Sequence, residues 1–320
     1  MRLPSYCFLP AALALLTASH IHAKAAFTHF IVSNAANYTV DDWQHDIALA
    51  QQAHITAFAL NVAQGQTYND VSIARAFVAA DNQNFKLFFS FDYAGNGPWL
   101  ESDVVSYLFN YISTGAYYYY SGRPFVSTFE GWQNAADWHS IKTVTGCFFV
   151  PDWSSLGAKA ALEQADGVAD GLFSWAAWPW GGQNIDTYID ASYRQYLNGK
   201  PYMMAGDNLW FDRWNEVMYV QPEWVEIISW NDYGESHYIG PIRENALSAL
   251  ASAPFNYVEN MPHDSWRTFL PYVINMYVNN ATSFTPRTGG QMVLMYIKTC
   301  RIGTDSHCRS AEVLDLLYEC

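Results

Sequence analysis

Two carboxylates three residues apart, Asp232 and Glu235, are the side chains in this sequence best placed to do chemistry together. They follow an apolar, β-branched run that begins at Val225 and is typical of a buried strand. Gly234 lies between them and would allow a sharp turn that brings both carboxylates into one space beside aromatic rings. This arrangement suits acid–base cleavage of a glycosidic bond. The alternative is a capped loop in which both carboxylates only accept backbone N–H bonds.

Glycosidic cleavage passes through an oxocarbenium-like state that needs an acid at the leaving oxygen and a second carboxylate across the sugar. We expect the loop to hold the two carboxyls about 6.5 to 9.5 Å apart, which leaves room for a water molecule and predicts inversion. Glu235, with a pKa raised by surrounding rings, is assigned as the acid, and Asp232 as the base. The reverse assignment stays open.

Further polar and aromatic side chains fall at or just beyond the ends of predicted strands, the face on which barrel enzymes build their sites. The predicted substrate-binding residues are Asn34, Asn61, Asp92, Glu130, Asp152, Trp178, Trp230, Asn231 and His237. The tryptophans that would add to a sugar-binding cleft are Trp99, Trp132, Trp153, Trp175 and Trp180. Helix capping and core packing are the alternatives for these residues. His237 fits substrate binding and loop support equally well, and His29 is interpreted as a satisfied core histidine.

Strand and helix patterns alternate eight times along the chain. No Gly-x-Gly-x-x-Gly follows the first strand, which argues against a doubly wound sheet. We therefore predict one α/β domain, a (β/α)8 TIM-type barrel over residues 24–280. The predicted strands are 27–34, 57–62, 86–92, 123–130, 147–153, 171–180, 201–204 and 225–230.

The two ends of the chain differ from the barrel in composition. Residues 1–23 carry Arg2, an apolar run and a short end at Ala23, the three parts of a secretory signal. We therefore expect a soluble protein that is secreted to the cell exterior or the cell wall and does not reside in a membrane. Residues 281–320 are expected to form a linker and a truncated C-terminal extension.

The amino-acid composition limits the classes of ligand that the protein could bind. Aromatic residues make up 17% of the chain and charged residues only 14%, and rings are costly to expose unless they line a groove or stack on a ligand. The net charge of -14 and the lack of a basic run exclude nucleic acid. The sequence has no nucleophile elbow, His-Glu-x-x-His or Walker motif. We expect no metal, no cofactor and a monomer.

The cysteines and two short motifs add expectations about covalent structure. The cysteines left after signal removal are Cys147, Cys300, Cys308 and Cys320. In an oxidising compartment their even number predicts two disulfides, which would tie the tail, with the partner of Cys147 left open. Asn37 and Asn280 begin Asn-x-Thr motifs and are candidate glycosylation sites.

With these residues in view, the chain resembles the fungal α-1,3-glucanases, or mutanases, of glycoside hydrolase family 71. The segments that carry the resemblance are residues 29–34, 57–61, 85–92, 124–131, 170–175 and 227–241, the last reading IISWNDYGESHYIGP. The resemblance implies a secreted barrel enzyme that hydrolyses α-1,3-glucosidic bonds with inversion and without a cofactor. It also implies that Asp232 and Glu235 match the catalytic pair of that family.

Three functions follow from this comparison. The expected one is an endo-acting hydrolase of α-1,3-glucan. The second is a secreted glucan-binding protein without turnover, because Gln66 stands where the family tends to have a carboxylate and an aromatic-rich segment after Met204 is missing. The third is a glycosidase that acts on a different linkage.

Overall fold

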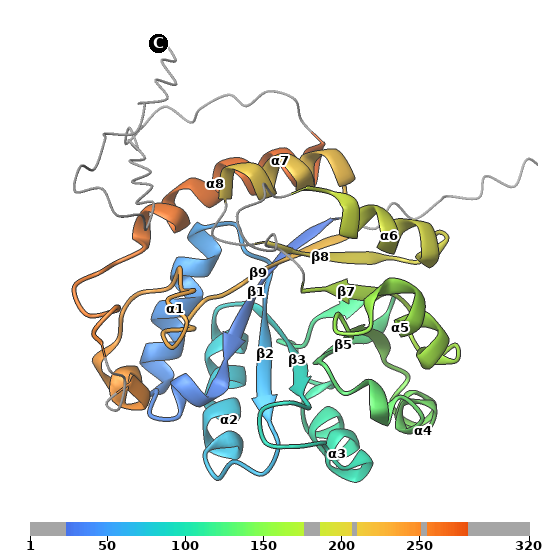
Figure 1. Cartoon of the computed structure of the whole chain (residues 1–320). Helices are drawn as coiled ribbons and strands as arrows, with labels where there is room; N and C mark the ends of the chain where they lie inside the picture. Colours follow the sequence, from blue (N-terminus) through green and yellow to red (C-terminus); the bar gives the residue numbers. More distant parts are fainter. Residues whose placement is uncertain (1–23, 176–185, 207–209, 251–254, 281–320) are drawn as a thin grey trace, which may run out of the picture.

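The computed structural model describes residues 24–175, 186–206, 210–250 and 255–280, which form a closed barrel of eight parallel strands (Figure 1). The strands follow one another around the ring in the order β3-β2-β1-β9-β8-β7-β6-β5, and pairing of β3 with β5 closes it. The strands are β1 (Ala25–Ile31), β2 (Ala57–Ala63), β3 (Lys86–Asp92), β5 (Arg123–Phe129), β6 (Phe148–Asp152), β7 (Leu172–Ser174), β8 (Tyr202–Gly206) and β9 (Trp224–Ile227). The short β4 (Tyr119–Tyr120) pairs antiparallel with β5. The predicted (β/α)8 barrel is confirmed.

Helices separate consecutive strands and pack around the outside of the ring (Figure 1). They are α1 (Val40–Gln52), α2 (Asn69–Asn82), α3 (Glu101–Tyr111), α4 (Asp137–Thr145), α5 (Gly157–Ala165), α6 (Tyr188–Leu197), α7 (Trp210–Val220) and α8 (Asp264–Asn279). Short 3-10 helices are η1 (Val32–Ala35), η2 (Trp132–Asn134) and η3 (Glu244–Leu250). Helix α1 begins with a capping box, in which Thr39 and Asp42 each bind the other's backbone N–H.

The barrel interior changes from aromatic to polar along the strands. At the amino-terminal ends, rings fill the barrel, and the centroids of Phe27 and Phe88 and those of Phe125 and Trp224 are each 4.9 Å apart. Because side chains in a strand alternate between faces, residues two positions farther along also point inward. Buried polar residues at these positions are His29, Ser90, Ser127 and Glu226. The ring cluster therefore closes one end, and polar groups face the other end.

Several predicted strands end earlier than expected, among them β7 and β9. β7 ends at Ser174 rather than at residue 180, and residues 176–180 lie outside the described part of the chain. β9 ends at Ile227, so the prediction that it reaches Trp230 is wrong. The Trp230 N–H still donates to the His29 carbonyl at 2.7 Å. After β9 ends, the chain thus keeps a hydrogen bond to β1. An apolar sequence pattern does not distinguish such a segment from a strand.

Ion pairs of Asp170 join three elements at the amino-terminal ends of the strands. Asp170 accepts the Phe149 N–H at 2.8 Å and pairs with Lys142 at 2.8 Å and Arg123 at 3.1 Å. Burial alone would raise the pKa of Asp170, but the Lys142 ammonium, the Phe149 N–H and the Arg123 guanidinium together hold that pKa below its usual range. The ionised carboxylate therefore stabilises the junction of α4, β5 and β6.

Several covalent and surface features can be placed. Cys147 is fully buried and forms no disulfide with another described residue, and burial raises the pKa of its thiol to about 11. The other three cysteines, the predicted signal and the predicted extension fall outside the described residues, so the two disulfides stay a prediction. Asn37 and Asn280 are exposed, as glycosylation requires.

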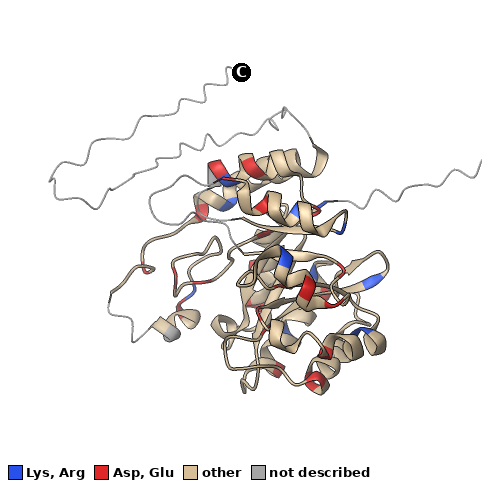
Figure 2. Ribbon diagram, turned by 45° about the vertical axis from the view of Figure 1, so that its right-hand side comes forward, with Lys and Arg blue, Asp and Glu red and all other residues tan. Residues whose placement is uncertain are grey.

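Acidic residues are spread over the helices, with few basic residues among them (Figure 2). Among the helices of the described ranges, none has both the length and the apolar character needed to cross a membrane.

Candidate active site

The loop from Ser229 to Gly240 carries both predicted catalytic carboxylates and folds back on itself. The His237 N–H donates to the Asp232 carbonyl at 3.0 Å, and these two residues form an isolated antiparallel bridge. The Ser229 N–H donates to the His237 carbonyl at 3.1 Å, and the Gly240 N–H donates to the Trp230 carbonyl at 2.8 Å. The loop is therefore a short hairpin whose own hydrogen bonds fix the backbone of Asp232.

The start of this loop is bound to β1. The side-chain amide of Asn231 accepts the Ile31 N–H at 2.8 Å and donates to the Ile31 carbonyl at 3.0 Å. The Asn34 amide donates to the Asn231 carbonyl at 2.8 Å. Asn231 is fully buried, is bonded to the backbone of β1 and does not line the cavity, so the prediction that it binds substrate is wrong. Asn231 positions the loop, and Asn34 supports it.

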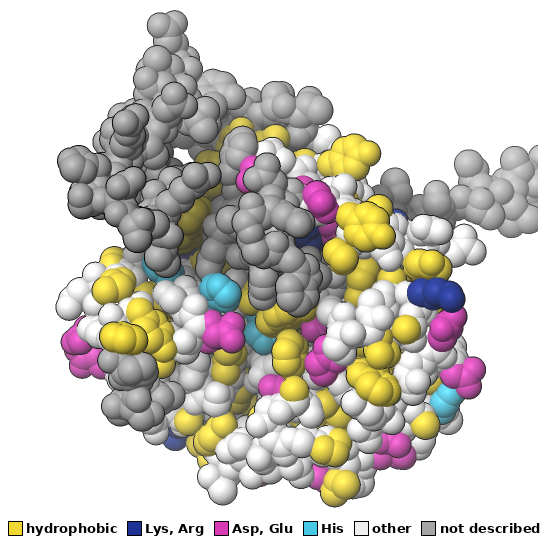
Figure 3. Space-filling model, viewed as in Figure 1, with side chains coloured by type: hydrophobic (Ala, Val, Ile, Leu, Met, Phe, Trp, Pro, Cys, Tyr) yellow, Lys and Arg dark blue, Asp and Glu magenta, His cyan; other side chains and the backbone are white. Residues whose placement is uncertain are grey.

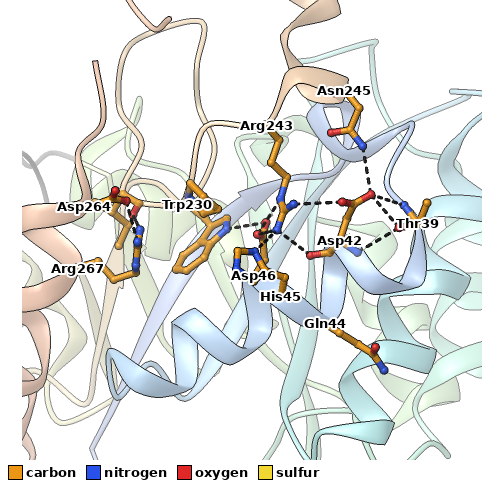
Figure 4. A network of polar contacts seen from close by, with 12 residues as sticks. Thr39, Asp42, Gln44, His45, Asp46, Trp230, Arg243, Asn245, Asp264 and Arg267 are labelled. Atoms are coloured by element: carbon orange, nitrogen blue, oxygen red, sulfur yellow. Dashed lines mark hydrogen bonds and ion pairs between the residues drawn. The ribbon is translucent and has the colours of Figure 1, made fainter. Parts of the chain in front are cut away.

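A buried carboxylate on α1 holds the loop from outside the barrel (Figure 4). Asp46 accepts the Trp230 indole N–H at 3.0 Å and the Arg243 Nε–H at 2.9 Å. Arg243 also binds Asp42 at 3.1 Å. Trp230 is fully buried in this contact, which corrects the prediction that its ring binds sugar. We call Asp42, Asp46, Trp230 and Arg243 the Asp46 cluster, and it fixes the segment on both sides of the two catalytic carboxylates.

A cavity of about 380 Å³ opens next to the loop, at the carboxyl ends of the strands. Its volume falls within the range of small-molecule sites, roughly 300 to 1,000 Å³. The polar and aromatic residues that line it are His29, Ser33, Asn61, Gln66, Tyr68, Asp92, Trp175, Asp232 and Glu235. Both predicted catalytic residues thus face one cavity. The face seen in Figure 3 carries histidine and acidic side chains close together near its centre.

The two carboxylates have different environments. The Asp232 carboxylate is partly buried and accepts the Glu235 N–H at 3.1 Å. Burial raises the pKa of Asp232, the Glu235 charge adds to this, and the Glu235 N–H and both His29 and His237 oppose it. The Glu235 side chain is 69% exposed and lies 3.5 Å from the His237 ring. Solvent therefore surrounds Glu235, and the expected ring environment of this carboxylate is wrong.

The glycine that the loop requires is Gly240 and not Gly234. The left-handed backbone in this loop occurs at Ser236, with a φ of 59°, whereas Gly234 has no positive φ. A Cβ on Gly240 would lie 2.6 Å from both the indole nitrogen and the carbonyl oxygen of Trp230. Close packing against Trp230 thus dictates a glycine at position 240.

Comparison with known sequences then identifies the family. The profile of the family described as "Glycosyl hydrolase family 71" matches residues 22–205 and 204–314. The chain belongs to glycosyl hydrolase family 71. It is 36% identical to "Mutanase Pc12g07500" of Penicillium rubens over 280 residues, which cover 78% of this chain and 60% of that protein. It is 35% identical to "Glucan endo-1,3-alpha-glucosidase agn1" of Schizosaccharomyces pombe over 294 residues, 79% of this chain and 66% of that protein. The chain therefore spans less than two thirds of the length of either relative.

Solved structures show the same barrel at low sequence identity. The GH99 endo-alpha-mannosidase from Bacteroides thetaiotaomicron, in complex with bis-tris propane, superposes with a TM-score of 0.61 at 14% identity, covering 80% of this chain and 99% of that one. A thermostable GH5 cellulase from an Icelandic hot spring isolate superposes with a TM-score of 0.53 at 11% identity, covering 84% of this chain and 91% of that one. These structures support the fold alone.

In this family 71 barrel, two of the other predicted substrate-binding residues reach the cavity. Asn61 and Asp92 line it from β2 and β3. One Asp92 oxygen also accepts the N–H groups of Ala94 and Gly95 at 2.8 and 2.7 Å. Asp92 therefore caps its own loop and also faces the cavity, and its role in substrate binding stays a prediction.

Two carboxylates that were predicted to bind substrate form hydrogen bonds within the protein. Glu130 binds the Ser155 N–H at 3.1 Å and its hydroxyl at 2.6 Å, and it does not line the cavity. Asp152 is fully buried, and burial raises its pKa well above its usual range. Asp152 accepts the Ser154 hydroxyl, and the same oxygen of Ser154 accepts the Trp175 N–H at 2.7 Å. Both carboxylates order the loops next to Trp175. The prediction that the fully buried Asp152 binds substrate is therefore wrong, whereas the prediction for Glu130, which is partly exposed, stays a prediction.

Most of the predicted aromatic cleft is core. The buried indoles of Trp99 and Trp153 donate to backbone carbonyls, each at 3.1 Å. Trp132 packs partly buried against the core, and Trp175 lines the cavity. Trp178 lies outside the described residues, as does Trp180. Within the described ranges, no group of three histidine, cysteine, aspartate or glutamate side chains is arranged to hold a metal ion.

Sequence reasoning missed several residues of this site. The missed residues are Tyr68, which lines the cavity, Asp46 and Arg243, which hold the loop, and Glu226, which binds the His29 ring. His29 was assigned to the core alone. Gln66, noted only as a departure from the family, also lines the cavity. Asp70 is exposed on α2 and accepts the Tyr107 hydroxyl at 2.8 Å, so it does not supply the carboxylate that Gln66 lacks.

Proposed function

We propose that this protein is a secreted glycoside hydrolase that cleaves α-1,3-glucosidic bonds within α-1,3-glucan, with inversion and without a cofactor. The observation that carries the proposal is that Asp232 and Glu235 line one cavity at the carboxyl ends of the strands of a family 71 barrel. The names of the relatives, a mutanase and a glucan endo-1,3-alpha-glucosidase, support the substrate and the endo mode.

The environments of the two carboxylates favour roles opposite to those predicted from the sequence. Burial raises the pKa of Asp232, which favours the protonated form that a general acid needs. Glu235 is exposed to solvent, where a carboxylate can activate the attacking water. In this proposal Asp232 protonates the oxygen of the leaving sugar, and Glu235 removes a proton from water on the opposite side of the ring.

A substrate that needs no acid separates the two roles. Fluoride leaves without protonation, so an α-fluoride of an α-1,3-linked gluco-oligosaccharide requires only the base. Asp232→Asn is expected to cleave the fluoride at a rate close to that of the parent, while its rate on the glucan falls about 10²- to 10⁴-fold. Glu235→Gln is expected to lose both activities. The opposite pattern would return Glu235 to the role of the acid.

A second candidate is a glucan-binding protein without turnover. It is favoured by Gln66, an amide that lines the cavity where the resemblance implies a carboxylate, and by the aromatic-rich segment that the resemblance implies is missing after Met204, close to where the family match divides into two ranges. Reducing-sugar release from α-1,3-, β-1,3- and α-1,4-glucans, measured beside a pull-down on each polymer, separates the candidates. Release from α-1,3-glucan alone supports the hydrolase. Binding to it without release supports the second candidate, and release from another glucan supports a different linkage.

Secretion and the monomeric state belong to the same proposal. Secretion is supported by the sequence of residues 1–23. Expression in a fungal host, followed by N-terminal sequencing of protein from the medium, is expected to give a chain that starts at Lys24. Light scattering of that protein is expected to give the mass of a single chain. Retention inside the cell with an uncleaved N-terminus, or the mass of a dimer, would contradict the corresponding statement.

A further inference from the structure

We infer that His29 is a substrate-binding residue, whose Nε2 atom forms a hydrogen bond with a hydroxyl of the sugar bound against Asp232, and that Glu226 positions its ring. The identity of the sugar as α-1,3-linked glucose rests on the proposed function. The role of His29 rests on its own geometry in the barrel.

The His29 ring is buried and faces the cavity. It projects inward from β1, is 3% exposed, and lines the same cavity as Asp232. Its Nδ1 atom lies 2.7 Å from the Glu226 carboxylate. No group of the described residues binds its Nε2 atom, so the nitrogen on the far side of the ring from Glu226 is available to a ligand in the cavity.

Glu226 fixes the state of this ring. It is fully buried on β9, the neighbour of β1, where it lies opposite Phe27 in the register. An ionised Glu226 can only accept a hydrogen bond, so in this form it places a proton on Nδ1 of His29 in either charge state of the ring. Burying a carboxylate is costly unless it is paired, and His29 is its partner in the barrel. The pair is therefore arranged to present one ring nitrogen to the cavity.

The surroundings of His29 hold the ring in place and next to the catalytic loop. The edge of the ring meets Trp175, with centroids 4.8 Å apart and planes at 82°. The backbone carbonyl of His29 accepts the Trp230 N–H at 2.7 Å, two residues before Asp232. A ligand that reaches Asp232 in this cavity therefore lies beside the His29 ring.

A neutral sugar hydroxyl suits this nitrogen. A hydroxyl both donates and accepts, so it can bind Nε2 of either neutral or protonated His29. The amides of Asn61 and Gln66 also line the cavity and provide further groups of the kind that bind hydroxyls. The chemistry of the cavity therefore favours a polyhydroxylated, uncharged ligand.

A pair of amide substitutions tests the inference. The amide of asparagine reaches the position of Nδ1 and the longer amide of glutamine reaches that of Nε2, so each replaces one end of the ring. In the inactive Asp232→Asn background, we would measure binding of an α-1,3-linked gluco-tetraose by calorimetry for His29→Asn and His29→Gln. His29→Asn is expected to weaken binding about tenfold and His29→Gln by much less, about threefold at most. The exposed His54→Asn is the surface control and is expected to bind like the background protein.

A purely structural role of His29 predicts the opposite order of effects for the two substitutions. If His29 only satisfied Glu226, His29→Asn would keep that bond, and His29→Gln would be the more damaging change in both thermal stability and affinity. Equal affinity of both variants and the background would also overturn the inference. Failure of the background protein to bind the tetraose at all would overturn the proposed function, and with it the sugar named for His29.

A direct readout completes the test. With ¹⁵N-histidine in the Asp232→Asn protein, the signals of His29 are identified by their loss in His29→Gln. Saturating tetraose is expected to shift the Nε2 signal of His29 while its Nδ1 stays protonated. An Nε2 signal that does not move while calorimetry shows binding would refute the contact.

Discussion

Substitution of Asp46 by asparagine removes the buried negative charge that binds residues on both sides of the catalytic loop. Asp46 is fully buried on α1, and its two oxygens bind the Trp230 indole and the Arg243 guanidinium (Figure 4). Asparagine keeps the shape of the side chain and one acceptor. It leaves Arg243, whose side chain is 13% exposed, with Asp42 as its remaining carboxylate partner in the Asp46 cluster.

The size of the effect follows from these contacts. Breaking a buried ion pair by removing one partner costs about 3 to 5 kcal/mol. Burial raises the pKa of Asp46 even beside Arg243, so desolvation offsets part of the attraction. Asp42 also retains its bond to Arg243 at 3.1 Å. We therefore expect a loss of about 2 to 4 kcal/mol in the free energy of unfolding, or roughly 4 to 8 °C in Tm for a barrel of this size.

The same change is expected to lower turnover, because Trp230 sits two residues before Asp232. Misplacement of catalytic groups by about 1 Å can cost on the order of 10²-fold in rate, and we expect a loss of about 10- to 100-fold in kcat well below the Tm of the variant. The assay combines urea unfolding with reducing-sugar release. Asp41→Asn, an exposed change of the same charge on the same helix, is the control and is expected to leave both quantities near those of the parent.

Two results would refute this reasoning. An Asp46→Asn protein within about 0.5 kcal/mol of the parent would show that the cluster does not stabilise the fold. A clear loss of stability with unchanged kcat would show that Asp46 supports the fold without positioning the loop.

Three further predictions follow from single residues. Gly240→Ala is expected to lower the free energy of unfolding by about 1 to 3 kcal/mol and to remove most of the activity, because its Cβ would overlap Trp230. Gly234→Ala is the control and should fold normally, since the nearest contact of its Cβ is at 3.4 Å. Equal unfolding curves for the two variants would contradict this. Asp170→Asn is expected to lower Tm above about pH 5. Its difference from the parent should shrink as the pH falls below about 4, the ordinary pKa of an aspartate, and then through the depressed pKa of Asp170; a difference that does not vary with pH would be inconsistent with the ion pairs. Iodoacetamide at pH 8 is expected to leave Cys147 unmodified in the native protein, since the side chain is buried and burial raises the pKa of its thiol to about 11, and mass spectrometry of the peptide would reveal native labelling that contradicts this.

The strands were readable from the sequence because they are short apolar runs, buried on both faces, that alternate with helical patterns. The predicted strand 86–92 matches β3 at both ends, where a charged residue marks each limit. The catalytic loop was readable because Asp232 and Glu235 are carboxylates at the end of the last strand, where a barrel collects its site, and both line the cavity.

The roles of Asn231 and Trp230 were not readable, because they depend on tertiary contacts. Asparagine and tryptophan are common in sugar sites, and nothing in their local sequence shows that β1 and α1 already bind them. The contact between Asn231 and Ile31 depends on how the loop after β9 continues along β1. A strand pattern does not contain that register.

Asp46 gave one signal that could have been used. It lies three residues after Trp43 and four before Ala50, on the buried face of α1. A carboxylate at such a position requires a partner, because burying it alone is too costly. Its partners, Trp230 and Arg243, are almost two hundred residues away in the sequence, so the need for a partner was readable and its identity was not.

The most direct test of the proposed hydrolase is the configuration of the first product. NMR of an α-1,3-linked gluco-oligosaccharide during cleavage would record the anomer formed before mutarotation, with the parent protein and with Asp232→Asn and Glu235→Gln. An inverting hydrolase that uses this pair gives the β anomer first, and both variants lose turnover by about 10²- to 10⁴-fold on this substrate. An α anomer formed first, or near-normal rates in both variants, would contradict the account.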